Sequence, residues 1–251
     1  MAWYITDGVL RRAPKAPTKR SILTDITAEG DVVIPEGVRE IEKCAFRHCR
    51  WLESVVIGGS VRRIGEYAFQ YCPNLKTVII EEGVTDLEKD AFNACESLTD
   101  VCIPHTMTHI GQSAFLTCFN LRSIRLAENH PVFRFENDML ITNQGELIFG
   151  NPQSNEAVIP EGVRCIGDHA FFMNERIEKV VIPEGVEQIG EWAFTLCTQL
   201  KEVNIPHGVT EIGAVAFDGC VNMEHISIPE SVREIGGNVF GDCRSLKKSR
   251  A

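Results

Sequence analysis

The spacing of the cysteines constrains the fold of this chain more than any other feature. Seven of the ten cysteines fall into two runs with a constant interval of 23 residues. The runs are Cys49, Cys72, Cys95 and Cys118, followed by Cys197, Cys220 and Cys243. A fixed period of about 20 to 50 residues is the signature of a repeat protein, in which each unit stacks on its neighbours. The spacing therefore predicts a solenoid.

Other positions follow the same interval, so the whole unit is repeated. The phrase "IPEGVREIEKCAF" begins at Ile34, and close copies begin at Ile159, Ile182 and Ile205. A phenylalanine precedes each cysteine position by three residues, and a leucine usually follows it by three. The unit can be written IPxxVxxIGxxAFxxCxxLxxVx. One such unit buries too few apolar side chains to fold alone, so stacking is required.

The apolar pattern inside the unit predicts its local structure. Segments such as "LESVVI" at 52–57 and "LKTVII" at 75–80 alternate and predict short strands. The AFxxC segment spaces its apolar residues by three and four, which suits one or two helical turns. We therefore expect a right-handed coil of short strands and short helical turns, built from about nine 23-residue units.

The unit "IPxxVxxIGxxAFxxCxxLxxV" resembles the repeat of the BspA-like leucine-rich repeat family, and the match extends from about Val32 to Leu246. The resemblance implies a leucine-rich repeat solenoid. It also implies a non-catalytic function, because the family consists mainly of surface proteins, adhesins and binding modules with diverse partners.

The repeat is interrupted once, which suggests four regions within a single solenoid domain. We expect an N-terminal cap and partial rung at 1–33, a first block at 34–125, an island at 126–158 and a second block at 159–251. In the island, the apolar runs "FRFENDMLIT" and "ELIFG" flank "NQG", which predicts a β-hairpin. The island is either a spacer between the blocks or a lip beside a binding face. The opening "YITDGVL" resembles "FENDMLI" at 135–141 and is expected to cap the first rung.

Charge and hydropathy limit the partners and the location. The chain has 25 Lys and Arg against 35 Asp and Glu, a formal net charge of -10, so we expect no nucleic-acid partner. No apolar run is long enough to span a bilayer, so we expect no membrane insertion. Asp7 and Gly8 interrupt the apolar start that a signal peptide needs, which predicts a cytoplasmic location for the sequence as written. A cell-surface or secreted location is expected if a signal has been removed.

No sequence motif indicates catalysis, a cofactor or a metal site. The chain has no Gly-x-Ser-x-Gly elbow, phosphate loop or His-Glu-x-x-His motif, so we predict that it is not an enzyme. Cys102, His105 and His109 lack the paired spacing typical of zinc sites. The column of repeat cysteines is expected to be a set of buried, reduced thiols, although stacked cysteines come close to disulfide distance.

One residue per unit points outward between the buried residues of the predicted strand. These residues are Val56, Ile79, Cys102, Arg125, Val181, Asn204 and Ser227. The first three form an apolar stripe on adjacent rungs, and charged residues flank the strands, as in protein-binding surfaces. The flanking residues assigned to the site are Lys76, Asp100, Arg122, Lys179 and Lys201.

The sequence therefore predicts a protein-binding module that uses its strand face. The alternative is a self-associating structural or adhesive surface protein, in which a second copy of the chain covers the same stripe. The island could also cover it.

Overall fold

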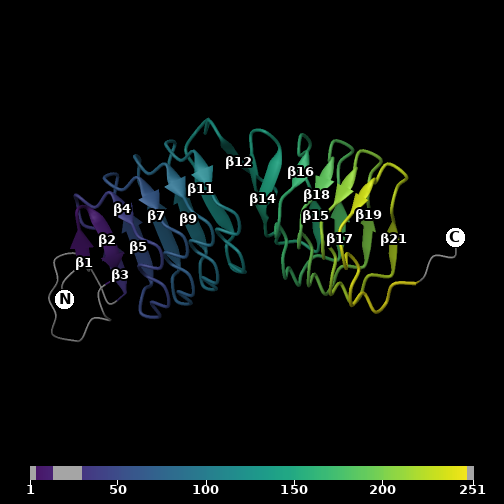
Figure 1. Ribbon diagram of the computed structural model, residues 1–251, viewed down its shortest axis with the longest axis horizontal. Coiled ribbons are helices and arrows are strands. Elements are labelled where there is room, and N and C mark those ends of the chain that lie inside the picture. The colour runs from purple at the N-terminus through teal and green to yellow at the C-terminus, as the bar shows by residue number, and fades with distance from the viewer. Residues whose placement is uncertain (1–3, 14–29, 248–251) are drawn as a thin grey trace. The chain divides into compact units, whose positions relative to one another are not determined.

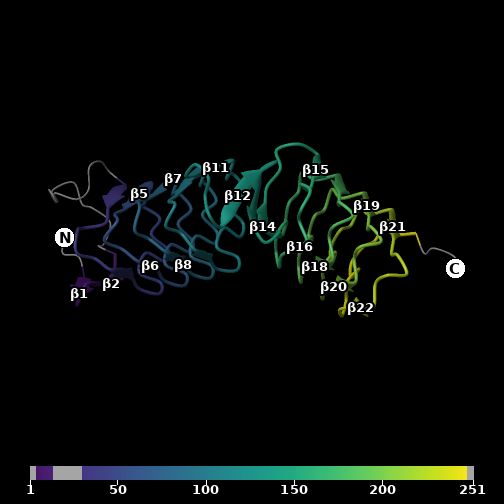
Figure 2. The same ribbon diagram turned by 90° about the horizontal axis from the view of Figure 1, so that it is seen from above.

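The computed structural model describes residues 4–13 and 30–247. It consists of two compact units, Met1–Val132 and Phe133–Ala251. In each unit the chain winds into stacked coils, as Figures 1 and 2 show. Equivalent residues of adjacent coils pair in parallel at the repeat interval, for example Ser54 with Thr77 and Lys179 with Glu202. The predicted solenoid is confirmed.

In the first unit, each complete coil contributes one long and one short strand. The long strands form a five-stranded parallel sheet: β3 (Asp31–Val33), β5 (Ser54–Ile57), β7 (Thr77–Ile80), β9 (Asp100–Ile103) and β11 (Ser123–Leu126). The short strands are β4 (Glu40–Ile41), β6 (Arg63–Ile64), β8 (Asp86–Leu87) and β10 (His109–Ile110). They continue a sheet that begins with β1 (Tyr4–Thr6) and β2 (Val9–Arg12).

The second unit repeats this plan. Its long strands are β15 (Glu156–Val158), β17 (Lys179–Val181), β19 (Glu202–Asn204) and β21 (His225–Ser227). Its short strands are β16 (Cys165–Ile166), β18 (Gln188–Ile189), β20 (Glu211–Ile212) and β22 (Glu234–Ile235). Three strands precede them in the same sheet: β12 (Phe133–Glu136), β13 (Met139–Thr142) and β14 (Glu146–Gly150).

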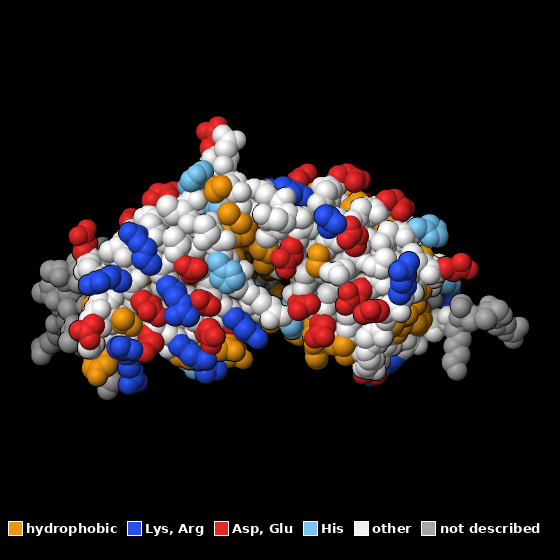
Figure 3. All heavy atoms as spheres, turned by 45° about the horizontal axis from the view of Figure 1, so that its top comes forward, with side chains coloured by type: hydrophobic (Ala, Val, Ile, Leu, Met, Phe, Trp, Pro, Cys, Tyr) orange, Lys and Arg blue, Asp and Glu red, His pale blue; other side chains and the backbone are white. Residues whose placement is uncertain are grey.

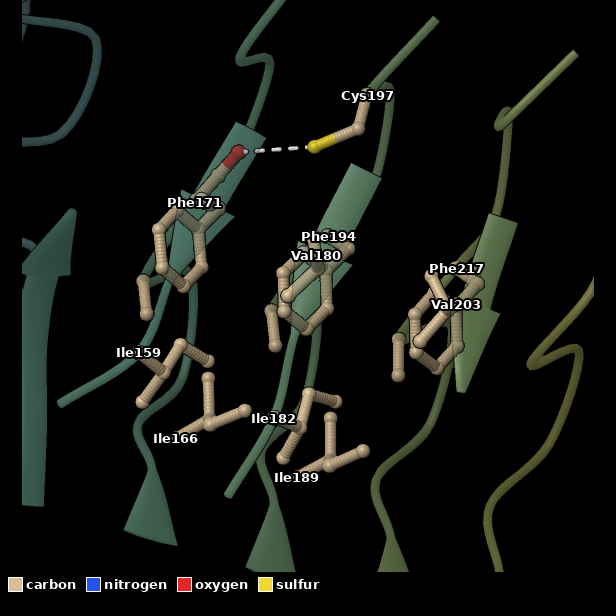
Figure 4. Close-up of a cluster of buried hydrophobic side chains, with 14 of the residues drawn as sticks. Ile159, Ile166, Phe171, Val180, Ile182, Ile189, Phe194, Cys197, Val203 and Phe217 are labelled. Carbon is tan, nitrogen blue, oxygen red and sulfur yellow. Dashed lines mark hydrogen bonds between the residues drawn. The ribbon is translucent and has the colours of Figure 1, made fainter. Parts of the chain in front are cut away.

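Identical side chains stack in register inside the coils. The rings of Phe171, Phe194 and Phe217 lie parallel on successive coils, with centroids 4.9 and 5.2 Å apart (Figure 4). The repeat cysteine lies beside this column, and the Cys197 Sγ donates a hydrogen bond of 3.2 Å to the Phe171 carbonyl. Equivalent bonds link Cys72 to Phe46 and other pairs. The repeated Phe and Cys therefore connect each coil to the one before it.

The AFxxC segment is not helical, which corrects the expected short helical turns. The described residues contain no helix, and hence no helix that could cross a membrane. A residue with positive φ directly precedes the Ala-Phe pair, and a second such residue lies two positions after the Phe. Tyr67 (φ 57°) and Tyr71 (φ 57°) are an example. Their backbone N–H groups donate to the next coil, at Lys89 and Asn93. Bonding between coils replaces the bonding within a helix that the apolar spacing suggested.

An antiparallel hairpin precedes the first short strand of each unit. In the first unit β1 and β2 form the hairpin, and Leu10 of β2 pairs with Ile41. In the second unit the equivalent hairpin is β13 and β14, and Leu147 pairs with Ile166. The counterpart of "YITDGVL" is therefore the segment "ITNQGEL", because Leu10 and Leu147 hold the same place. The segment "FENDMLI" resembles "YITDGVL" in a different respect: Asp7 and Gly8, like Asn137 and Asp138, both have positive φ in a two-residue turn between antiparallel strands.

The first apolar run of the island is divided into two strands. β12 and β13 pair antiparallel on either side of Asn137 and Asp138, which both adopt positive φ, at 51° and 60°. Asn and Asp tolerate this conformation better than other non-glycine residues, and two such residues in succession make a tight hairpin turn. β12 therefore adds a third strand before β14.

Candidate functional site

We call the outward side of the long strands the strand face. Every residue that the sequence assigned to the site lies on this face or directly beside a long strand. The two long-strand sheets lie in different units, so the assigned residues form two sets. The set of the first unit is Val56, Lys76, Ile79, Asp100, Cys102, Arg122 and Arg125. The set of the second unit is Lys179, Val181, Lys201 and Asn204.

In the first unit, the register of the parallel sheet aligns five outward side chains in one column. The column contains Val33, Val56, Ile79, Cys102 and Arg125. The exposed fraction is 37% for Val33 and 38% for Ile79, and Arg125 is also exposed. Val56 and Cys102 are half-buried. We call this set the apolar column, since four of its five members are apolar and adjacent.

The second unit has a shorter apolar segment. Val158 and Val181 pair in register and are 45% and 38% exposed, and the column continues with the polar residues Asn204 and Ser227. Sequence reasoning missed Val33 and Val158. Each of these two residues comes directly before an Ile-Pro pair, in "VVIP" and "AVIP". The equivalent residue of every other unit is among those that the sequence predicts to point outward.

The lysines beside the strands are paired with glutamates of the preceding coil. Lys76 lies 2.8 Å from Glu53. In the second unit, Lys179 lies 2.9 Å from Glu156 and Lys201 lies 2.7 Å from Glu178. The hydrogen bond that Lys179 donates to the Glu156 carboxylate raises the pKa of Lys179 above its ordinary value. These pairs are exposed, so each adds little stability, but each leaves less charge available to a partner.

Three other assigned residues keep their charges unpaired. Asp100, Arg122 and Arg125 form no ion pair with any described residue of the chain. Asp100 begins β9, while Arg122 precedes β11 and Arg125 lies within it. The strand face of the first unit therefore combines the apolar column with charges of both signs at its C-terminal strands that form no ion pair within the described part of the chain.

Each strand face also has a shallow depression that includes assigned residues. In the first unit, a depression of about 540 Å³ is lined by Cys102 and Arg125, among others. In the second, one of about 490 Å³ is lined by Lys179, Val181 and Asn204 together with β21. Both are open and shallow, which suits a protein surface better than an enclosed small molecule.

The short-strand face of the first unit offers a contrast at Arg63, which is paired on both sides. Arg63 bridges two neighbouring coils, at 3.0 Å from Glu40 and 2.8 Å from Glu88. Figure 3 shows acidic and basic side chains interleaved over the first unit. Arg63 is therefore neutralised by glutamates of its own unit.

The buried cysteines have no reactive character. Burial raises the pKa of Cys118 and of Cys197 to about 12, so both thiols stay protonated near neutral pH. All ten cysteines lie among the described residues and carry free thiols. Asn174 takes the cysteine position once, and its Oδ1 accepts hydrogen bonds from the N–H groups of Arg176 and Ile177. A buried polar atom beside the backbone is therefore the common requirement at this position.

Of the histidines near Cys102, His130 is held by the local backbone. His130 is buried; its Nε2 lies 2.8 Å from the Pro104 carbonyl and its Nδ1 accepts from the Val132 N–H. The His105 ring lies 5.9 Å from the His130 ring. Across residues 4–13 and 30–247, no group of three or more His, Cys, Asp or Glu side chains could hold a metal ion.

The repeats match the model of the BspA type leucine-rich repeat region over residues 27–140 and 134–247. The chain belongs to the BspA-type leucine-rich repeat family. The family resemblance seen in the repeated unit is thereby confirmed. Among curated protein sequences, none matches.

Several solved structures resemble this BspA-type chain. The pneumococcal vaccine antigen PcpA is 17% identical with a TM-score of 0.71, and the match covers 87% of this chain and 67% of PcpA. A leucine-rich repeat protein from Eubacterium ventriosum is 21% identical with a TM-score of 0.72, covering 86% and 64%. A leucine rich cell surface protein from Faecalibacterium prausnitzii is 26% identical with a TM-score of 0.53, covering 86% and 77%. The chain thus spans about two thirds of the length of the first two structures.

Proposed function

We propose that this chain is a non-catalytic protein-binding module whose partner lies on the strand face. The apolar column of the first unit is the observation that carries the proposal. Val33, Val56, Ile79 and Cys102 stand on consecutive strands, which lie about 4.8 Å apart in a sheet. A continuous apolar surface of this kind is a feature of protein interfaces.

Unpaired charges beside the column support the same proposal. Asp100, Arg122 and Arg125 lie at one end of the sheet and have no partner among the described residues to neutralise them. Charges at the rim of an interface orient the partner and discriminate against wrong ones. The partner predicted here has an apolar stripe, with carboxylates placed to meet Arg122 and Arg125.

We include a location at the cell surface or outside the cell in this proposal. The family resemblance and the Faecalibacterium prausnitzii structure, whose name describes a cell surface protein, support it. This replaces the cytoplasmic expectation as the working hypothesis. Self-association through the strand face, as in a structural or adhesive protein, is the competing function.

A double substitution that adds negative charge to the strand face tests the proposal. In Ile79→Glu with Arg125→Glu, both changed side chains are exposed on the strand face, so folding should be preserved. The matched control is Arg39→Glu with His109→Glu, which introduces the same change of charge at exposed positions away from the long strands of the same unit. Wild type and both variants are used to capture proteins from cell and extracellular extracts, and the bound proteins are identified by mass spectrometry.

The proposal predicts a protein held by the wild type and the control but lost from the strand-face variant. Equal capture by all three would exclude the strand face as the binding site. Loss of association between copies of the chain itself, with no other protein affected, would favour the competing function.

A further inference from the structure

The turn side, meaning the segment from the end of a short strand to the residue after the repeat cysteine position, carries an exposed aromatic cluster in each unit. In the first unit the Tyr67 ring lies under the Lys43 Nζ at 5.2 Å, and the Arg47 guanidinium lies 5.9 Å from the rings of Tyr67 and Tyr71. Tyr71 is 45% exposed and stacks on the His48 ring at 4.9 Å. We call Lys43, Arg47, Arg50, Tyr67 and Tyr71 the basic patch.

The second unit places aromatic residues at the same repeat positions. Trp192 holds the position of Tyr67, and Phe172 holds that of Arg47. Their rings lie 6.3 Å apart, and Trp192 is 38% exposed. We call Asp168, Phe172, Glu175, Glu191 and Trp192 the acidic patch.

The charges are opposite at two pairs of equivalent positions, whereas Glu66 and Glu191 are also equivalent and are both acidic. Lys43 is matched by Asp168, and Arg50 is matched by Glu175. Beside the basic patch, the Glu66 carboxylate is bound to Lys43, and the Glu42 carboxylate is bound to Arg11. Within the acidic patch, Arg176 is the nearby cation, and its guanidinium donates to Gln153. Each patch therefore keeps a net charge of its own sign.

The backbone does not require aromatic residues at these positions. Tyr67 and Trp192 have positive φ, of 57° and 59°. Other coils hold the same conformation with Ser113 (φ 59°) or Asn238 (φ 56°). Because a bulky residue is disfavoured in the left-handed region, local structure does not explain Tyr67 or Trp192. Tyr, Trp and Arg are the residues that most often dominate binding energy at protein interfaces.

We propose that the basic patch of one copy binds the acidic patch of a second copy. The Arg47 guanidinium then has an aromatic partner in Trp192, and Glu175 and Glu191 face the cations of the first patch. The contact joins two different surfaces, so it builds either a closed ring or an extended assembly. This surface differs from the strand face, and the proposal stands independently of the function proposed above.

Sedimentation velocity of the 251-residue chain tests the contact between the two patches directly. The wild type is examined up to on the order of 100 µM protein, where weak association is detectable. We expect a concentration-dependent assembly that weakens as salt is raised, because the patches attract through exposed charges. A wild type that stays monomeric throughout this range at low salt would overturn the proposal.

Two charge-reversed variants make the test specific. One carries Lys43→Glu with Arg47→Glu, and the other carries Glu175→Lys with Glu191→Lys. Each variant alone should lose association by at least tenfold, since its two patches then carry the same sign. An equimolar mixture should associate again, because the reversed patches complement each other. Association that persists in either variant, or a mixture that fails to recover it, would overturn the proposal.

Two controls keep these outcomes interpretable. The neutral variant Lys43→Gln with Arg47→Gln avoids repulsion from Glu66 and should weaken association without affecting the folded state, which circular dichroism checks. The strand-face variant Ile79→Glu with Arg125→Glu should associate as the wild type does. If the strand-face variant alone abolishes association, the contact lies on the strand face and the patch proposal is wrong.

Discussion

At the residue scale, the fold depends on identical side chains that meet in register. Phe92 is fully buried, and its ring stacks on Phe69 at 5.0 Å and on Phe115 at 5.9 Å. A typical coil supplies one such ring and one thiol donor, so a change at one position affects two neighbouring coils. This is how a chain whose single unit cannot fold alone forms a continuous core.

Removing one ring from the column should be costly. We expect Phe92→Ala to lower the free energy of unfolding by about 3 to 5 kcal/mol, because it leaves a cavity between two stacked rings. Chemical denaturation measures the loss. Ile79→Ala, on the exposed strand face, should change stability by less than about 1 kcal/mol. A loss of similar size in both variants would contradict the stacked core.

The buried thiols predict a loss of stability at alkaline pH. The pKa values of Cys118 and Cys197 are raised from 9.0 to about 12 in the folded state. The stability they contribute is complete below pH 9 and is lost as the pH rises toward 12, because the unfolded thiols ionise first. Each thiol should remove about 1.4 kcal/mol per pH unit within this window.

Urea denaturation at a series of pH values from neutral upward measures this slope. In Cys118→Ser with Cys197→Ser, the hydroxyl can still donate to the carbonyls of Phe92 and Phe171, but it does not titrate in this range. The slope should therefore be shallower in the variant. Equal slopes would show that these thiols are not the groups responsible.

At the element scale, the strands could be predicted from the sequence, but the backbone conformation of the turn side could not. Alternation in "SVVI" and "TVII" is a direct consequence of a strand with one buried face, so β5 and β7 could be predicted. The left-handed residues could not, since Tyr67, Thr117 and Val215 are not the residues that normally mark positive φ. The stacking of coils imposes their conformation.

Replacing a poorly suited residue at one of these positions should stabilise the protein. Val215 is β-branched and has a φ of 53°, whereas the next coil has Asn238 at the same place. We expect Val215→Asn to raise the free energy of unfolding by about 0.5 to 1 kcal/mol, because Asn tolerates the left-handed region. Thermal unfolding measures the shift. The control is Val221→Asn, at a half-buried position without positive φ, which should give no such gain. A gain in stability at Val221, or a loss at Val215, would argue against backbone strain at Val215.

At the scale of the whole molecule, the repeat predicted the solenoid but only part of the candidate site. Periodicity places Val56, Ile79 and Cys102 on one face, because register follows from a constant interval. It did not reveal the pairing of Lys76 with Glu53, which depends on side-chain reach between coils. Nor did it reveal the opposite charges of the two turn sides, since this requires knowing which residues flank the exposed aromatic rings.

The central claim of this account is that the strand face is the recognition surface. Isothermal titration of the captured partner against wild type, the Ile79→Glu with Arg125→Glu variant and the Arg39→Glu with His109→Glu control tests it most directly. We expect the strand-face variant to raise the Kd by at least about 100-fold, or about 2.7 kcal/mol, while the Kd of the control stays within about threefold of the wild-type value. A partner that binds all three proteins with the same Kd would contradict the claim.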